Sequence, residues 1–383
     1  MKVYLDNAAT TPLSQDMKEY LKNMLDIYGN PSSAHSVGKE ARQVIENARD
    51  AVRKFINANP DESDILFTSG GSASNTLAIK GMIELYEHYC QIADIPKIFT
   101  YYSPALHKSA LKAIYAASCS ARALEISNDG KIKLPALKKT LTSIKDFHIK
   151  PFIVIEHANS EIGSVQPIKE IINLVHQYNG IVYIDCTGSI STTPIDVQEL
   201  DADMIGFSGH KIGALKGTGI LYKKNIVILS PLIYGSQEDG RFGGTENLLG
   251  IASLGYAVAN YDYSHISTAE RDFVLQYLKN NIKGIRQIGG SLPHNLFLCI
   301  EGITGRTLTS MLDDKYNIQI STGSACNSRN KEHSLILSEI GLSEKEIDSC
   351  VRLSFSGQET VEELSYVCNA LIMCIDTLRK AGV

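Results

Sequence analysis

Two spacings of apolar residues alternate along most of the chain. Helical spacing, with apolar residues recurring every three or four positions, predicts amphipathic helices, whereas short continuous apolar runs predict buried strands. We expect helices at about 16–28, 41–56, 72–89, 105–117 and 168–178, and strands at 65–67, 97–102, 151–157, 181–185 and 203–208. Such alternation indicates an α/β fold with a mainly parallel sheet covered by helices on both faces. Functional residues should then gather where the strands end.

The pattern changes after about residue 250. Longer helices follow, with sparser strands expected at 296–300 and 351–355. We therefore predict a large domain over residues 13–250 and a smaller α+β domain formed by 1–12 and 251–383.

Composition excludes several classes of protein. The chain has 383 residues and a formal net charge of −5, and its Lys and Arg residues are scattered, so no direct binding of nucleic acid is expected. No apolar run is long enough for a membrane helix, and the sequence starts without a signal-peptide pattern, so we expect a cytoplasmic protein. The eight cysteines include no C-x-x-C pair, which argues against a metal site and favours free thiols.

Two ionisable residues follow predicted strands. Lys211 lies in FSGHKIGALKGTG, directly after the strand that ends at Ser208. A lysine there is often only a surface residue, but Ser, His and a glycine-rich loop around it suit a lysine that forms Schiff bases. Asp185 ends the run IVYID one strand earlier. It could cap a turn, or it could pair with the protonated ring nitrogen of pyridoxal phosphate (PLP).

Three further features have a structural and a functional interpretation. TSGGSASN, residues 68–75, predicts a strand, a Gly-Gly-Ser turn and a helix N-terminus that could bind phosphate, although such turns are common. His107 could be structural, or it could stack on a cofactor and move protons. Cys326, in STGSACNSR, lies among small polar residues, so it is either an inert loop thiol or a reactive one.

Taken together, these residues resemble the cysteine desulfurases, a branch of the class V aminotransferase group with the fold type I architecture of PLP enzymes. The resemblance covers nearly the whole chain, and the serine-rich cysteine loop resembles the group in which that loop is long and flexible. The motifs that carry it are YLDNAATTP, GNPSSAHSVGKEAR, FTSGGSASNTLAIKG, HANSEIGSVQPI, YIDCTGS, FSGHKIGALKGTG, GSQEDGRFGGTEN, STGSACNS and VRLSFS.

The resemblance assigns roles to residues at matching positions. Lys211 would hold PLP, Asp185 would pair with its ring nitrogen, and His107 would stack on the ring and act in proton transfer. Arg352 and Asn7 would bind the substrate, with the Arg352 guanidinium on the substrate carboxylate. The remaining residues at cofactor positions are Gly71, Ser72, Ser208 and His210 for the phosphate, Ser160 near the ring, and Thr245 for the phosphate of a partner subunit, which implies a homodimer.

The reaction implied by the resemblance gives Cys326 a purpose. Sulfur would leave L-cysteine as a persulfide on Cys326, L-alanine would be released, and a mobile loop at about 321–332 would carry the sulfur to an acceptor protein. A different PLP reaction, such as that of a selenocysteine lyase or a carbon–sulfur lyase, and a non-enzymatic adaptor are the alternatives.

Four departures from the family pattern bear on this interpretation. Ser160 stands where the family usually has Asn, Gly188 where it has Gln, and Ala73 where it has Glu. The first two replace contacts to the cofactor ring, each hydrogen bond being worth about 0.5–1.5 kcal/mol. The sequence ends at Val383 without the tail that docks iron–sulfur scaffolds. We therefore expect a sulfur donor for a dedicated pathway, such as tRNA thiolation or DNA phosphorothioation.

Overall fold

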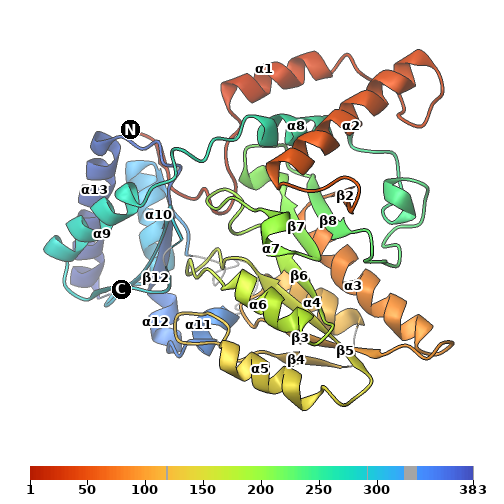
Figure 1. Cartoon of the computed structure of the whole chain (residues 1–383). Coiled ribbons are helices and arrows are strands. Elements are labelled where there is room, and N and C mark those ends of the chain that lie inside the picture. Colours follow the sequence, from red (N-terminus) through yellow and green to blue (C-terminus); the bar gives the residue numbers. More distant parts are fainter. Residues whose placement is uncertain (118–119, 291, 323–333, 383) are drawn as a thin grey trace.

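A seven-stranded sheet forms the centre of the protein (Figure 1). The computed structural model describes residues 1–117, 120–290, 292–322 and 334–382. The strands β3, β4, β5, β6 and β7 are parallel, whereas β8 runs antiparallel to both of its neighbours. The order across the sheet is β2 (Ser63–Thr68), β8 (Gly219–Lys224), β7 (Met204–Ser208), β6 (Ile181–Asp185), β5 (Ile149–Glu156), β3 (Lys97–Tyr102) and β4 (Ala121–Ala123).

Both faces of this sheet are buried, which explains the continuous apolar runs in the sequence. Along β5, Phe152 and Val154 enter one hydrophobic core, whereas Ile153 and Ile155 enter the other, because successive side chains point to opposite faces. The first core also contains residues of α3 (Gly71–Tyr89) and α4 (Lys108–Ala117); the second contains residues of α1 (Gln15–Met24), α2 (Ser36–Phe55), α5 (Leu134–Ser143), α6 (Ile168–His176), α7 (Val197–Leu200) and α8 (Leu248–Ala259). The predicted α/β fold is confirmed.

A separate core lies beside the central sheet (Figure 1). Residues of a three-stranded antiparallel sheet, in the order β12 (Cys350–Ser354), β10 (Asn295–Ile300) and β9 (Ile285–Gln287), share it with α9 (Ala269–Asn281), α10 (Gly305–Tyr316) and α13 (Val361–Ala381). The N-terminal strand β1 (Val3–Tyr4) joins this side by pairing in parallel with β11 (Ile318–Gln319). Two short helices, α11 (Leu335–Glu339) and α12 (Glu344–Asp348), precede β12.

The division into residues 13–250 and 1–12 with 251–383 stays a prediction. Helix α8 crosses the predicted boundary and packs against α1 and α2 of the large core. Nowhere in the described ranges is there a helix long and apolar enough to cross a membrane.

A buried ion pair fastens the loop that precedes α8. Both guanidinium ends of Arg49 contact the Glu238 carboxylate, at 3.0 and 3.1 Å, and the Phe67 N–H donates to the same carboxylate at 2.8 Å. The side chains are 14% and 4% exposed, so these charges have little access to water. Glu238 belongs to the short helix η2 (Glu238–Gly240), and the pair therefore ties the loop to α2 and to the edge strand β2.

We expect Glu238→Ala to lower the free energy of unfolding by about 3 kcal/mol or more, because it leaves the Arg49 charge buried without its partner. Urea unfolding of the purified protein measures this. Glu19→Ala is the control, since Glu19 pairs with Lys22 on the surface, where both side chains are more than half exposed, and we expect it to change stability by less than about 1 kcal/mol. Equal losses in the two variants would contradict the structural role given to Glu238.

Candidate active site

A cavity of about 420 Å³ lies where β5, β6 and β7 end. It brings together residues that are far apart in the sequence, as expected for the carboxyl edge of a parallel sheet. Among the predicted site residues, its lining includes Lys211, Asp185, His107, Gly71, Ser72, Ser208, His210 and Ser160.

Asp185 is held rigidly at the end of β6. The Asn75 side-chain amide, from α3, donates to its Oδ2 at 2.8 Å, and the Thr187 N–H donates to its Oδ1 at 2.9 Å. Tyr183 orients the amide of Asn75 by donating its hydroxyl to the amide oxygen at 2.5 Å. Each oxygen of this carboxyl group, which lines the cavity, thereby has a donor within the protein.

The N-terminus of α3 forms the end of the cavity that suits an anion. Gly70, the residue before the helix, has a φ of +135°, a conformation that L side chains rarely adopt. A Cβ atom on Gly71 would lie 2.9 Å from Thr187 Oγ1 and 3.4 Å from Ser208 Cβ, so glycine keeps this corner open. The free N–H groups of the first helical turn and the hydroxyls of Ser72 and Ser208 can donate to phosphate oxygens there.

His210 and Lys211 follow β7 in the short helix η1 (Gly209–Lys211). Burial, reinforced by Lys211 and Lys216, lowers the pKa of His210 to about 4, so its ring is neutral at pH 7. Burial, reinforced by Arg352, also lowers the pKa of Lys211 to about 8, although Asp6 and Asp185 oppose this. About a tenth of the Lys211 amine is therefore neutral at pH 7 and about half at pH 8, far more than for an ordinary lysine, and the neutral amine is the nucleophilic form.

His107 comes just before α4. The Ser109 N–H donates to its Nδ1 at 3.2 Å, so a neutral His107 ring bears its proton on Nε2. The Ser109 hydroxyl lies 2.8 Å from the same Nδ1 and accepts from the Asn75 amide at 3.0 Å. Asn75 thereby links His107 to Asp185 on the floor of the cavity.

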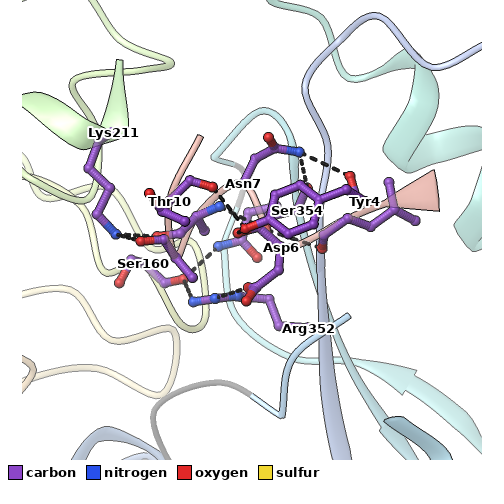
Figure 2. Close-up of polar contacts among 12 residues, drawn as sticks. Tyr4, Asp6, Asn7, Thr10, Ser160, Lys211, Arg352 and Ser354 are labelled. Atoms are coloured by element: carbon purple, nitrogen blue, oxygen red, sulfur yellow. Dashed lines mark hydrogen bonds and ion pairs between the residues drawn. The ribbon is translucent and has the colours of Figure 1, made fainter. Parts of the chain in front are cut away.

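The N-terminal segment lies against both candidate cationic residues (Figure 2). Lys211 Nζ donates to the carbonyl oxygens of Ala8 and, at 3.1 Å, Ala9. Arg352, on β12, donates from one guanidinium nitrogen to Asp6 Oδ1 at 2.7 Å and from another to the Ser160 carbonyl at 2.9 Å. Its Nε is buried and finds no partner among the described residues. The guanidinium therefore keeps donors available for a ligand carboxylate.

The substrate role of Asn7 stays a prediction. Its side-chain amide donates to the backbone carbonyls of Tyr4, at 3.3 Å, and Ser354, at 3.0 Å (Figure 2). Asn7 lines a second cavity, of about 710 Å³, which shares Lys211, Thr187 and Gly188 with the first.

Known proteins with this sequence pattern and fold decide the family. The aminotransferase class-V family matches residues 3–367. The cysteine desulfurase IscS of Dictyoglomus turgidum is 33% identical over 99% of this chain and 95% of its own. Among solved structures, a NifS-like protein from Rickettsia africae has a TM-score of 0.86 and 27% identity over 98% of this chain and all of its own. A structure of SspA in complex with cysteine has a TM-score of 0.78 and 28% identity over 94% of this chain and all of its own.

The chain belongs to the class-V aminotransferase family. Within that family it is a cysteine desulfurase, a PLP-dependent enzyme with the fold type I architecture.

The cavity of this cysteine desulfurase fits PLP. Its walls offer an anion site at α3, a carboxylate at Asp185 for the ring nitrogen, and the Lys211 amine for the aldehyde. Two buried oxygens of the same lining, Thr187 Oγ1 and Glu156 Oε2, have no partner in the described part of the chain. Unpaired buried polar atoms are rare in proteins, so both atoms point to a polar occupant.

At Ser160 and Gly188 this chain lacks the side chains of the family pattern, and the backbone leaves no room for one at position 188. A Cβ atom on Gly188 would lie 2.4 Å from the Ala158 carbonyl oxygen and 3.3 Å from the Ser160 N–H nitrogen. No side chain fits at position 188 unless the backbone moves. The desulfurase therefore has no side-chain donor at Gly188, and Ser160 offers a short one.

Four predicted residues are not in the lining of this cavity. Asn7 lines the second cavity only, and Arg352 lines neither but bonds to Ser160, which lines the first. Thr245 is exposed and lines neither cavity, and its contact with a partner subunit stays a prediction. Cys326 lies outside the described residues, as does most of the predicted loop at about 321–332. The described residues on either side are at the site: Ser321 pairs with Arg352 through backbone hydrogen bonds, and Ser334 lines the cavity.

Sequence reasoning missed four residues of this site. Asn75 and Thr187 lie inside the quoted motifs, where a polar residue one turn after Gly71, or two residues after Asp185, is a weak signal. Asp6 gave no signal, because its contact with Arg352 joins opposite ends of the chain. Glu156 did leave one, since it is a charged residue that ends the apolar run 151–157.

The lowered pKa of Lys211 can be tested through its two charged neighbours. Only the neutral amine attacks an aldehyde, so the rate at which the PLP-free protein takes up PLP should rise with pH and level off above about pH 8. Asp6→Asn should move the midpoint to lower pH, because it removes a charge that stabilises the ammonium form. Arg352→Gln should move it to higher pH, because it removes a repelling charge. Stopped-flow absorbance measures both, and shifts in the same direction would refute the assigned causes.

Proposed function

We propose that this desulfurase removes sulfur from L-cysteine, releases L-alanine, and passes the sulfur through Cys326 to an acceptor protein. The observation that carries the proposal is the convergence of Lys211, Asp185 and His107 on one cavity, with Arg352 close to Lys211. A structure of the related SspA contains cysteine, which supports the choice of substrate.

Arg352 and Lys211 have complementary parts in this proposal. The Arg352 guanidinium binds the carboxylate of cysteine with the donors that Asp6 and the Ser160 carbonyl leave free. The Lys211 amine, whose pKa is lowered to about 8, accepts the proton from the α-carbon in its neutral form. Bound PLP supplies an electron sink for the charge that this leaves.

His107 and Cys326 act in the step that removes sulfur from the substrate. The His107 ring carries a proton on Nε2, which it can donate. The Cys326 thiolate attacks the sulfur of cysteine, so an S–S bond forms while the C–S bond breaks. The carbon that loses sulfur takes up a proton, and alanine results. The positions of Ser321 and Ser334 support delivery of Cys326 to this cavity.

A homodimer is part of the proposal. Residues 226–234 expose four large apolar side chains, namely Ile226, Ile228, Ile233 and Tyr234, which are between 46% and 85% exposed. Grouped exposed apolar residues are typical of an interface. The same loop continues to the exposed Thr245, which we propose binds the phosphate in the partner subunit.

We further propose that the acceptor belongs to a dedicated pathway, such as tRNA thiolation or DNA phosphorothioation. The support is the altered wall at Ser160 and Gly188. Transfer of labelled sulfur from the desulfurase to purified candidate acceptors tests this, and equal transfer to an iron–sulfur scaffold would contradict it.

The persulfide route predicts different defects for two variants. Lys211→Ala should lose the visible absorbance of bound PLP together with alanine release. Cys326→Ser should keep the absorbance but release alanine at least about 100-fold more slowly, the size expected when a nucleophile is removed. Absorbance spectra and alanine assays measure the two properties. Alanine release by Cys326→Ser at the parent rate would instead favour a lyase that needs no cysteine.

Arg352→Lys tests the carboxylate site. Lysine keeps the charge but loses the fork that holds a carboxylate with two hydrogen bonds, so KM for cysteine should rise about tenfold or more. Lys216→Arg is a control for a basic residue on the glycine-rich loop that lines neither cavity. Cysteamine, which lacks the carboxylate, should bind the parent and Arg352→Lys equally well, as measured by competition with cysteine. An unchanged KM would remove Arg352 from the substrate site.

A further inference from the structure

A second buried carboxyl group faces the cavity beside Asp185. Glu156 is the last residue of β5, and it lies directly opposite Asp185 in the parallel pairing of β5 with β6. Glu156 is only 4% exposed and lines the cavity. None of the steps given above uses it.

The two oxygens of Glu156 have different surroundings. The Gln166 side-chain amide donates to Oε1 at 2.6 Å. Gln166 is fixed in this orientation, because the same nitrogen donates to the Gly130 carbonyl at 3.0 Å and its oxygen accepts from the Ile132 N–H at 2.9 Å. The hydroxyl of the buried Ser103 also bonds to the Glu156 carboxyl group. Oε2 has no partner among the described residues.

Burial favours the protonated form of this group. It raises the pKa of Glu156 to about 7, and the neighbouring Asp185 adds to the rise, whereas the bonds from Ser103 and Gln166 oppose it. Two adjacent carboxyls do not readily ionise together. Asp185 has a donor on each oxygen, whereas Glu156 has an oxygen without one, and Glu156 is mostly protonated below pH 7.

The unpaired oxygen needs an acceptor from the occupant of the cavity. Glu156, at the end of β5, and Ala158 and Ser160, in the turn that follows, all line the cavity. This wall is the one in which Gly188 provides no side chain. On PLP, the phosphate belongs at α3, the ring nitrogen at Asp185 and the aldehyde at Lys211. The acceptor that remains is the phenolic oxygen of the ring.

We propose that Glu156 is a cofactor-binding residue whose neutral carboxyl group donates a hydrogen bond to the phenolic oxygen of PLP. This rests on the proposed assignment of the cavity as the PLP site. The Glu156 side chain supplies a hydrogen-bond donor at a wall where the Ser160 side chain is short and Gly188 has no side chain.

The proposal predicts a pH dependence with a definite sign. As pH rises through about 7 in the PLP-free protein, Glu156 loses its proton and gains a charge beside the ring oxygen, so the affinity for PLP should fall. The other titratable groups around the cavity are Asp185 on β6, Lys211 and His210 at η1, His107 and Lys108 at the start of α4, and Glu161 after β5. His157, next to Glu156, has its pKa lowered by burial to about 4 and stays neutral in this range.

The test is the equilibrium affinity of the PLP-free protein for PLP between pH 6 and 9, followed by absorbance, for the parent and two variants. Glu156→Gln keeps a donor that cannot ionise, so it should bind PLP as tightly as the parent at pH 6 and lose the parent's fall in affinity near pH 7. Glu156→Met has a similar shape and no donor, so at pH 6 it should bind about tenfold more weakly, the loss expected for one hydrogen bond to a charged group. The other titratable groups of the cavity are the same in all three proteins, so the differences between the profiles report Glu156.

Glu161→Gln is the matched control. Glu161 is an equally buried glutamate of the same cavity, and its Oε2 accepts from the Ser334 hydroxyl at 2.8 Å. This variant should keep the parent's fall in affinity. A Glu156→Met protein with parent affinity at pH 6, or a fall that persists in Glu156→Gln, would overturn the proposal. A parent protein that does not bind PLP at all would instead refute the assignment of the cavity.

Discussion

The contact of Arg352 with Asp6 and the Ser160 carbonyl is the interaction on which the site depends. It joins three segments that lie at opposite ends and near the middle of the chain: the N-terminal segment, the turn after β5, and β12 of the smaller sheet. The same charges act on Lys211, since Arg352 lowers its pKa and Asp6 raises it. One network thereby joins the two sheets and modifies the pKa of the lysine, which burial lowers most.

The parallel sheet imposes a second constraint, because it gathers polar groups at one edge and removes them from water. Asp185, Glu156 and Ser208 each end a strand whose preceding residues are buried on both faces. Each polar atom at this edge must find a donor or acceptor, or it destabilises the fold. Asp185 finds Asn75 and Thr187 within the protein, whereas Glu156 Oε2 and Thr187 Oγ1 do not. Glu156 and Thr187 both line the cavity, where a polar ligand can supply the missing partners.

Much of this arrangement follows from local sequence. The apolar runs predicted the parallel strands, and Lys211, Asp185 and His107 follow strands in the order that places them at one edge. Contacts between distant segments could not be read in that way. The pairing of β1 with β11, which carries Asp6 to Arg352, joins residues more than 300 positions apart and has no local signal. The proton on Glu156 is likewise a consequence of burial, which a sequence does not display.

At Gly188, the local sequence and the contacts between distant segments each show part of the cause. The sequence shows only that a donor is missing there, which suggests a weaker hold on the ring. The structure adds that the Ala158 carbonyl occupies the space of a side chain, so the loss is built into the backbone and a single substitution would not reverse it. Ala158 also lines the cavity, between Glu156 and Ser160 in the sequence. The backbone path that excludes a side chain at 188 therefore belongs to the wall that presents Glu156. The family pattern has Asn and Gln side chains at the positions of Ser160 and Gly188, and their amide donors do not titrate. If the Glu156 carboxyl group donates to the ring oxygen instead, this wall binds the ring with a donor that ionises near neutral pH. Cofactor binding in this desulfurase then becomes sensitive to pH in the range where Lys211 also changes its charge.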